Sequence, residues 1–559
     1  MKDLLEQIAF VDGSIERILW QIDRDPLSPT HGCAHLAFWR DKTSDVADAR
    51  RQEAMLPLAL LYIRDYPGSR WHGDPRLKSA VVALLKFWVK SQYCDGSFDE
   101  WYAGERAYAA AAFTTFAVSM TLLEMHDNLP HDISEAGRKA IGRSADWLCR
   151  RNDLFKTNHQ AVGAAALAWA GKLLDTTRYR QQAKKKLDSI VAVQTTEGWF
   201  PEVGAMDPGY TFLTVEYATA AMDALGDWSQ LAPFIRAFDF ACELLKPNLS
   251  VCSEAGICKN PYFSRIAAIR LAEHSSFASR TWDRLSEETP DFSSYANVLG
   301  DDLRLLRWAF QPLVAYDTWQ ACRTRKRIPS KPLPLEGIQK EVKIFPEAGF
   351  VRFNKVSASG IVIAANGGPV WLFGGNAHSS SFADIGYAFQ SGDGFATNMC
   401  YDKTIGCRYD GDILSLLLPI VRVKKFFPPF WARVLLRFAC STTIGSRVAR
   451  GFIDFIRGLK GTPVNQSSGN ISGSECLGEI RRDVLLGGET ITLRDDISLR
   501  HSLSLSSCLA LSCTDEDGMQ TKPLQESATS VADVARISVE KIYAHDGKVW
   551  NLSSSAVKV

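Results

Sequence analysis

The sequence predicts a two-domain protein, in which a toroid of helical hairpins precedes an antiparallel β-sandwich. Three observations predict this fold class. The chain has 559 residues, which is more than one hydrophobic core usually supports. Apolar residues recur at three- and four-residue spacing as far as about residue 325, which is typical of packed helices. Beyond about residue 338 the apolar segments are short, β-branched and aromatic, with glycines between them, which is typical of strands.

The first domain, residues 1–325, is predicted to consist of helices joined by short breaks. The clearest helical patterns lie at residues 49–66, 76–92, 108–125, 135–151, 159–174, 178–194, 214–228 and 232–246. About six hairpins of roughly 50 residues each fit this length, and the Ala-rich helices are suited to packing on two sides. We therefore expect an incomplete (α/α) barrel, a toroid of hairpins, rather than a four-helix bundle.

The second domain, residues 338–559, follows a basic, Pro-rich stretch at 326–337 (KRIPSKPLPLEG) that is suited to a linker. Residues 479–498 contain two strand-like runs around Gly-Gly-Glu and predict a hairpin, and residues 501–511 alternate with period two. These patterns predict an antiparallel β-sandwich.

One segment, residues 418–460, interrupts the strand pattern and is predicted to be a basic helical insertion. It contains nine Lys and Arg against the single acid Asp454. Such a segment forms either a membrane-surface helix or a contact with a polyanion, or else it packs on the sheet with its basic face in water. Pro428 and Pro429 break any long amphipathic face, which favours packing on the sheet.

Composition excludes several function classes. The 64 Lys and Arg nearly balance 63 Asp and Glu, which argues against a nucleic-acid partner. The sequence has no P-loop, dinucleotide fingerprint, HExxH or paired CxxC motif, so we expect no cofactor. His31, Cys33 and His35 have no identifiable fourth ligand, so we expect no metal either.

The compartment is predicted from what the chain lacks. The first 20 residues have no uninterrupted apolar stretch of the kind that a secretory signal needs. Thirteen cysteines, an odd number without a tight framework, are typical of free thiols in a reducing compartment. We expect a cytoplasmic protein, or a periplasmic one if a leader was removed.

Candidate functional residues gather in three loop-to-helix segments, at residues 94–108, 156–171 and 196–217. The same ends of consecutive hairpins meet at one mouth of a toroid, where polar and aromatic side chains form a carbohydrate cleft. Each residue also has a structural interpretation: Asn158 as a helix cap, Asp207 in a turn, and Tyr210 in the core. The candidates are Glu100, Trp101, Tyr102, Glu105, Arg106, Asn158, His159, Trp199, Glu202, Asp207 and Tyr210.

These segments resemble the heparinase II/III-type polysaccharide lyases, a family that includes alginate and heparin lyase-like enzymes, and especially members associated with bacterial surface polysaccharides. The resemblance is carried by GSFDEWYAGERAYAAAAFTT, TNHQAVGAAALAW and EGWFPEVGAMDPGYTFLTVEY, and more faintly by FADIGYAFQSGDGFATN. It implies an (α/α) toroid followed by a β-sandwich, and β-elimination at a uronic acid of an anionic polysaccharide.

The resemblance also implies roles for individual residues. Asn158 resembles the family's carboxylate-binding Asn, and Tyr210 its catalytic Tyr, which serves as acid and in one geometry as base. His159 is placed to assist or to act as the base. The family usually adds a His from the β domain, for which His378 is the nearest candidate. A cation that helps the Tyr is expected among three residues: Arg106, Arg70 and His72.

Two other function classes stay open. Helical toroids also host glycoside hydrolases, which need two carboxylates, here Glu100 or Glu105 with Glu202 or Asp207. The chain is alternatively a non-catalytic polysaccharide-binding or assembly protein. Two further partners are predicted beside the anionic polysaccharide: a membrane, contacted peripherally through residues 418–460, and a second copy of the chain in a homodimer.

Overall fold

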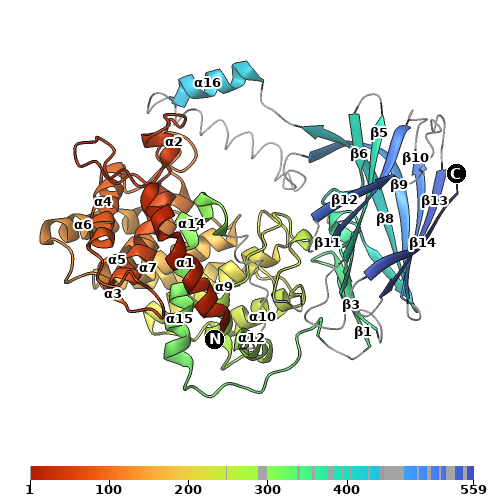
Figure 1. Ribbon diagram of the computed structural model, residues 1–559, viewed down its shortest axis with the longest axis horizontal. Coiled ribbons are helices and arrows are strands. Elements are labelled where there is room, and N and C mark those ends of the chain that lie inside the picture. Colours follow the sequence, from red (N-terminus) through yellow and green to blue (C-terminus); the bar gives the residue numbers. More distant parts are fainter. Residues whose placement is uncertain are drawn as a thin grey trace.

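The computed structural model describes residues 2–440 and 471–558 except for short stretches, the longest of which are 287–298, 374–381 and 524–535. Of residues 441–470 it describes only a few. Figure 1 shows a helical half beside a half made of strands, joined by an extended segment that follows the last helix of the helical half. The prediction of a helical toroid followed by an antiparallel β domain is confirmed.

The helical half is built of an inner and an outer set of helices. Helices α5, α7 and α9 are buried on nearly every side, because their sequences are Ala-rich and apolar all round. The helices between them bury one face only, as amphipathic outer helices do. The elements are α1 (Lys2–Trp20), α2 (Leu36–Trp39), η1 (Ala49–Ala54), α3 (Met55–Ile63), α4 (Pro75–Ser91), α5 (Tyr108–Glu124), α6 (His131–Cys149), α7 (Thr157–Leu173), α8 (Thr177–Val191), α9 (Pro208–Leu225), α10 (Leu231–Cys242), η2 (Ser253–Ala255), α11 (Arg265–Leu271), α12 (Ser276–Ser286), α14 (Asp302–Trp308) and α15 (Phe310–Cys322).

The inner helices alternate with outer ones, so they run in the same direction and begin at the same end of the toroid. The loops that precede them are held together at this end. Lys156 and Glu202 form an antiparallel bridge, and Thr157 Oγ1 donates to the Pro201 carbonyl at 2.8 Å. Gly96 allows the loop before α5 to approach α6, since it has a φ of 96° and a Cβ there would lie 2.1 Å from the Arg143 carbonyl oxygen. The three predicted loop segments therefore share one mouth.

The strand half is one antiparallel sheet that folds over itself. In the described residues the main path of the sheet runs β1-β2-β3-β4-β5-β6-β8-β9-β10-β13-β14. The strands are β1 (Glu341–Phe345), β2 (Phe350–Asn354), β3 (Ser359–Val362), β4 (Val370–Phe373), β5 (Phe382–Ser391), β6 (Gly394–Thr397), β7 (Cys407–Asp410), β8 (Ile413–Lys425), β9 (Ile471–Leu485), β10 (Thr490–Leu499), β11 (Leu505–Thr514), β12 (Gly518–Pro523), β13 (Arg536–His545) and β14 (Trp550–Lys558). The expected hairpin at 479–498 is formed by β9 and β10.

A buried ionic network joins the two layers of this folded sheet. Arg482 of β9 donates to Asp384 of β5 at 2.9 Å and to Asp495 of β10 at 2.7 Å. Lys541 of β13 also donates to Asp384, at 2.6 Å. Because β5 is not a neighbour of β9, β10 or β13 in the sheet, these contacts cross the interior between two facing layers.

The two halves pack against each other through apolar and ionic contacts. Trp199 and Phe240 of the helical half lie in one buried cluster with Phe345 and Phe350 of β1 and β2. Beside it, Glu243 accepts hydrogen bonds from Lys343 and Arg352, both at 2.6 Å. These contacts fix the sheet beside the toroid.

The basic insertion begins later than the sequence predicted. Residues 418–425 belong to strand β8, in which Leu414, Leu416, Leu418 and Ile420 are buried with period two; the charged pattern masked this alternation. Helix α16 (Phe430–Cys440) follows, and residues 451–460 lie outside the described residues. The helical half ends with α15 at Cys322 and β1 begins at Glu341. No helix in the described part of the chain is long and apolar enough to cross a membrane.

Candidate functional site

The first turn of α7 carries the two polar residues that the sequence singled out. Asn158 is almost fully buried, and its Nδ2 donates to Glu202 Oε2 at 2.7 Å. It is not the helix cap, because α7 begins at Thr157 and Lys156 occupies the cap position. The amide of Asn158 is thus turned toward a carboxyl group.

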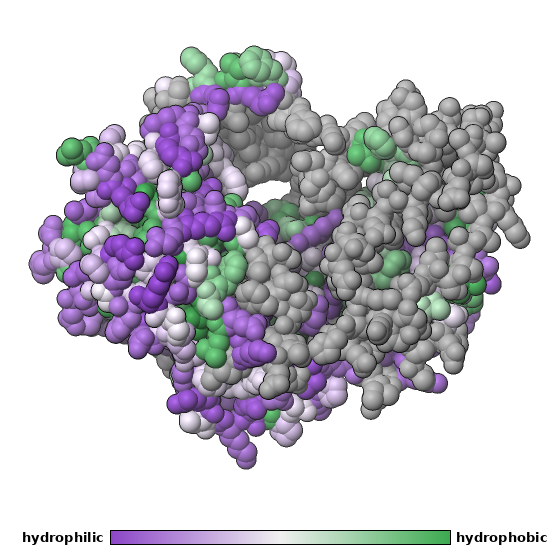
Figure 2. Space-filling view, viewed as in Figure 1, coloured by the Kyte–Doolittle hydropathy of each residue, from purple (hydrophilic) through white to green (hydrophobic). Residues whose placement is uncertain are grey.

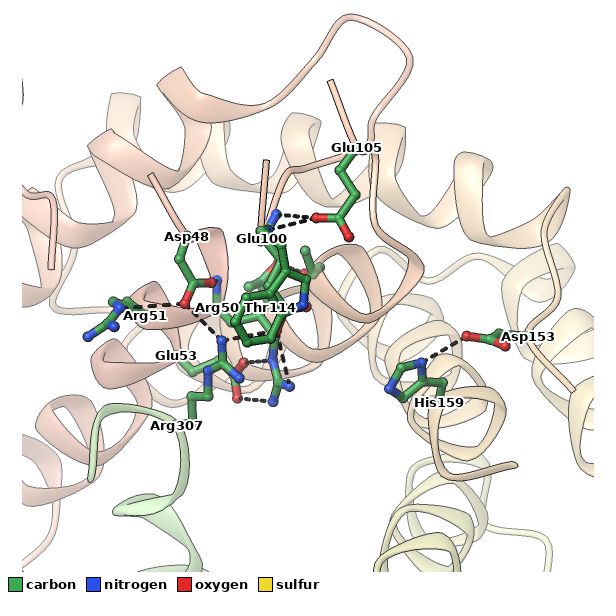
Figure 3. Close-up of polar contacts among 12 residues, drawn as sticks. Asp48, Arg50, Arg51, Glu53, Glu100, Glu105, Thr114, Asp153, His159 and Arg307 are labelled. Atoms are coloured by element: carbon green, nitrogen blue, oxygen red, sulfur yellow. Dashed lines mark hydrogen bonds and ion pairs between the residues drawn. The ribbon is translucent and has the colours of Figure 1, made fainter. Parts of the chain in front are cut away.

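His159, the next residue, is held by a carboxylate that the sequence analysis did not select. Its Nδ1 lies 2.8 Å from Asp153 Oδ2, as Figure 3 shows. Burial lowers the pKa of His159, and Asp153 opposes this shift, so the ring is neutral at neutral pH. Asp153 accepts the Nδ1 proton, which leaves Nε2 as the basic nitrogen, and the described residues give Nε2 no hydrogen-bond partner. In the sequence, Asp153 is marked only by its position as a loop carboxylate six residues before His159.

Tyr210 lies in the first turn of α9, which begins at Pro208, six residues earlier than the sequence predicted. Asp207 caps this helix by accepting from the Tyr210 backbone N–H at 3.0 Å. Gly209 permits close packing, because a Cβ there would lie 2.0 Å from the Asn260 carbonyl oxygen. Burial and the nearby Glu202 raise the pKa of Tyr210, so its hydroxyl stays protonated and is suited to donating a proton.

The cation that faces these residues is Arg50, which the sequence analysis missed. Its guanidinium lies over the ring of Phe113, 3.7 Å from the ring centre, and His159 lies edge-on to the same ring at 6.2 Å. The charge of Arg50 acts to lower the pKa of both Tyr210 and His159. Arg50 also donates to Glu53 at 2.7 Å. Arg50 gave no sequence signal, because it lies in the short polar segment Ala49–Ala54 and only the fold brings it near Phe113 and His159.

The three cations expected from sequence do not take this position. Arg106 pairs with Asp95 and lies over the ring of Tyr93. Arg70 and His72 are exposed in the loop after α3, at the opposite end of the toroid. That end is identified by Arg64, which follows α3 and pairs with Glu124, the last residue of α5, at 2.6 Å. The sequence pattern did not show that the loop after α3 and the loops before the inner helices lie at opposite ends of the toroid.

Most of the predicted substrate-binding carboxylates are engaged in structural contacts. Glu100 is buried beside Arg307, whose Nη2 lies 3.0 Å away, and Glu105 accepts the backbone N–H of Trp101 at 2.7 Å (Figure 3). Asp207 also accepts the Cys258 N–H at 3.0 Å. Burial raises the pKa of Asp207 to about 7 and that of Glu202 to about 8. The arrangement therefore offers no pair of accessible carboxylates across a bond, as a glycosidase needs.

The predicted aromatic residues divide between surface and core. Trp101 is 68% exposed and Tyr102 is half-buried, so both border the mouth near the start of α5. Trp199 is 6% exposed and packs in the cluster between the two halves, so its ring does not border the mouth as a surface for substrate. His378 lies outside the described residues.

Comparison with known families now bears on this site. Residues 28–203 match the family model described as the ulvan lyase N-terminal domain. The match supports a polysaccharide lyase. It includes Asn158, His159, Arg50 and Asp153 and ends shortly before Tyr210. It does not single out the heparinase II/III type.

One solved structure shows the same fold with little sequence identity. A chondroitin AC lyase of Streptomyces coelicolor A3, in complex with chondroitin sulphate, is 10% identical, with a TM-score of 0.55 over 99% of this chain and 76% of that chain. A chondroitinase AC lyase studied in oligosaccharide complexes is 9% identical, with a TM-score of 0.45 over 97% of this chain and 76% of that chain. No curated protein matches the sequence.

Proposed function

We propose that the protein cleaves a uronic-acid-containing anionic polysaccharide by β-elimination at the mouth of the toroid. The observation that carries this proposal is the grouping of Asn158, His159 and Tyr210 on the first turns of two adjacent inner helices, with His159 held by Asp153. The match of residues 28–203 to a lyase domain supports the reaction class.

The reaction first requires that the substrate carboxylate be neutralised, because the C5 proton is otherwise too weakly acidic. Asn158 supplies an amide donor without adding negative charge. Glu202 adds a second donor, because a carboxyl group with a pKa near 8 is protonated at neutral pH. Its hydrogen bond to Asn158, at 2.7 Å, supports this assignment.

The proton transfers are then divided between His159 and Tyr210. Nε2 of neutral His159 takes the C5 proton, the C4–C5 double bond forms, and the C4–O4 bond breaks. The Tyr210 hydroxyl gives its proton to the departing O4, and Arg50 stabilises the resulting phenolate. The sequence left the choice of base open; the raised pKa of Tyr210 and the lowered pKa of His159 favour His159.

The test is a screen of uronate polymers with the full chain, read by the ultraviolet absorbance of an unsaturated product. Tyr210→Phe and His159→Ala should each lower the rate by at least about a hundredfold, the usual contribution of general acid or base catalysis. Tyr409→Phe, a partly exposed Tyr on β7, is the matched control and should leave the rate unchanged.

The outcomes separate the open classes. Retained turnover by Tyr210→Phe would remove this residue from the mechanism. A reducing end without ultraviolet absorbance would indicate a hydrolase. Polymer binding without turnover, unchanged in an Asn158→Ala, Tyr210→Phe double variant, would indicate a non-catalytic polysaccharide-binding protein.

A further inference from the structure

Helix α16, in the insertion that follows β8, exposes an apolar stripe. Its members are Phe430, Trp431, Val434, Leu435 and Phe438, all at least 47% exposed. Their spacing of one, four, five and eight residues places them on a single arc of the helix. Exposed large apolar residues are ordinary when scattered, but a contiguous stripe on one helix marks a contact surface.

The basic residues of α16 flank this stripe. Arg433 and Arg437 are four residues apart and therefore share a side of the helix next to the apolar arc. Arg437 Nε lies 3.0 Å from Asp45 of the helical half, so this side is turned toward the toroid. In Figure 2 the apolar residues of α16 form the outer edge of the molecule, and hydrophilic residues lie beneath them. The stripe thus points away from the protein body.

The charged residues of helix α16 and of the strand before it have one sign in the sequence. Between Ile413 and Cys440 the sequence contains five Lys and Arg and no Asp or Glu. A basic helix with an aromatic and aliphatic face is the pattern of helices that lie in the headgroup region of a bilayer. An anionic polysaccharide would pair with the charges and stack on the aromatic rings, but it does not account for the exposed aliphatic Val434 and Leu435.

We propose that α16 docks the protein peripherally on an anionic lipid surface. The aromatic and aliphatic side chains enter the boundary between headgroups and acyl chains, and the exposed Arg433 and Arg437 of α16 pair with lipid phosphates or carboxylates. This proposal is independent of the catalytic site, since none of the residues in the mechanism belongs to α16.

Co-sedimentation of the full chain with lipid vesicles tests the proposal. The protein should sediment with vesicles of equal parts phosphatidylcholine and phosphatidylserine, much less with phosphatidylcholine alone, and less as salt is raised. A Trp431→Ser, Leu435→Ser double variant should lose at least about tenfold in vesicle affinity, because two large apolar side chains are removed. Trp20→Ser is the matched control, since Trp20 on α1 is 67% exposed and Trp431 is 64% exposed.

Three outcomes would overturn the proposal. The first is equal binding to neutral and anionic vesicles, and the second is unchanged vesicle binding by the double variant. The third is a wild-type protein that binds no vesicles but forms a dimer, together with a double variant that is a monomer. The last result would identify the stripe as an interface between copies of the chain. Size-exclusion chromatography and thermal unfolding, run on each variant, separate lost docking from lost folding.

Discussion

The contact between Asp153 and His159 gives the sharpest test of the proposed chemistry. The perturbation is Asp153→Asn, which keeps the size and shape of the side chain and removes its charge. Asp153 Oδ2 lies 2.8 Å from His159 Nδ1, within the range of a charge-assisted hydrogen bond. In the variant the imidazole loses the anion that orients it and stabilises its protonated form.

The size of the effect follows from this geometry. A hydrogen bond to a charged group contributes about 1.5–3 kcal/mol. Because about 1.4 kcal/mol corresponds to a factor of ten in rate, kcat/KM should fall roughly tenfold to a hundredfold. The loss is smaller than that of His159→Ala, since the base itself remains.

The pH profile distinguishes this role from a merely structural one. Activity should rise with pH as His159 loses its proton, with a midpoint below the ordinary pKa of 6.5 because burial disfavours the charged ring. Asp153 holds that pKa up, so Asp153→Asn should shift the acidic limb to lower pH while lowering the plateau.

The assay is kcat/KM for the cleaved polymer, measured by ultraviolet absorbance across this limb. Asp127→Asn is the matched control, because Asp127 pairs with His126 at 2.9 Å on the exposed surface, far from any predicted role. An acidic limb that stays in place in Asp153→Asn, with a reduced plateau, would refute the reasoning and leave Asp153 with a structural part only.

Two further predictions concern buried charge. The activity of the wild type should fall as pH rises through about 8, because Glu202 ionises there and no longer donates to the substrate. Glu202→Gln should abolish this fall, because its amide stays neutral. Folding raises the pKa of Glu202 from 4.5 to about 8, so the contribution of this group to stability is full below pH 4.5 and is lost as pH rises toward about 8. Over that window the free energy of unfolding of Glu202→Gln should therefore fall less steeply with pH, by about 1.4 kcal/mol per pH unit. Arg482→Met should lower the free energy of unfolding in urea by about 3–5 kcal/mol, since it leaves Asp384 and Asp495 buried without their guanidinium. The matched control is Arg481→Met, on the exposed side of the same strand; an equal loss there would contradict the argument.

The helices were largely predictable because their signals are local. The Ala-rich segments that the sequence marked as packing on two sides are the inner helices α5 and α7, and apolar spacing located most of the others. The start of α9 was missed because Asp207-Pro208-Gly209 indicates a turn as well as a helix start. Residues 418–425, the last part of strand β8, were predicted as helix because their cations hid a two-residue apolar alternation.

The sequence by itself determined the two halves of the chain, the class of fold and the loops that hold Asn158, His159 and Tyr210. Only the tertiary structure decided that Arg50 lies over the Phe113 ring beside His159, that Asp153 holds the imidazole, and that Trp199 belongs to the interface between the halves. The physical reason is the distance along the chain over which the interactions act. Helix and strand patterns arise from neighbours a few residues apart, whereas the charge and burial around a site depend on side chains that only the packing of distant segments brings together.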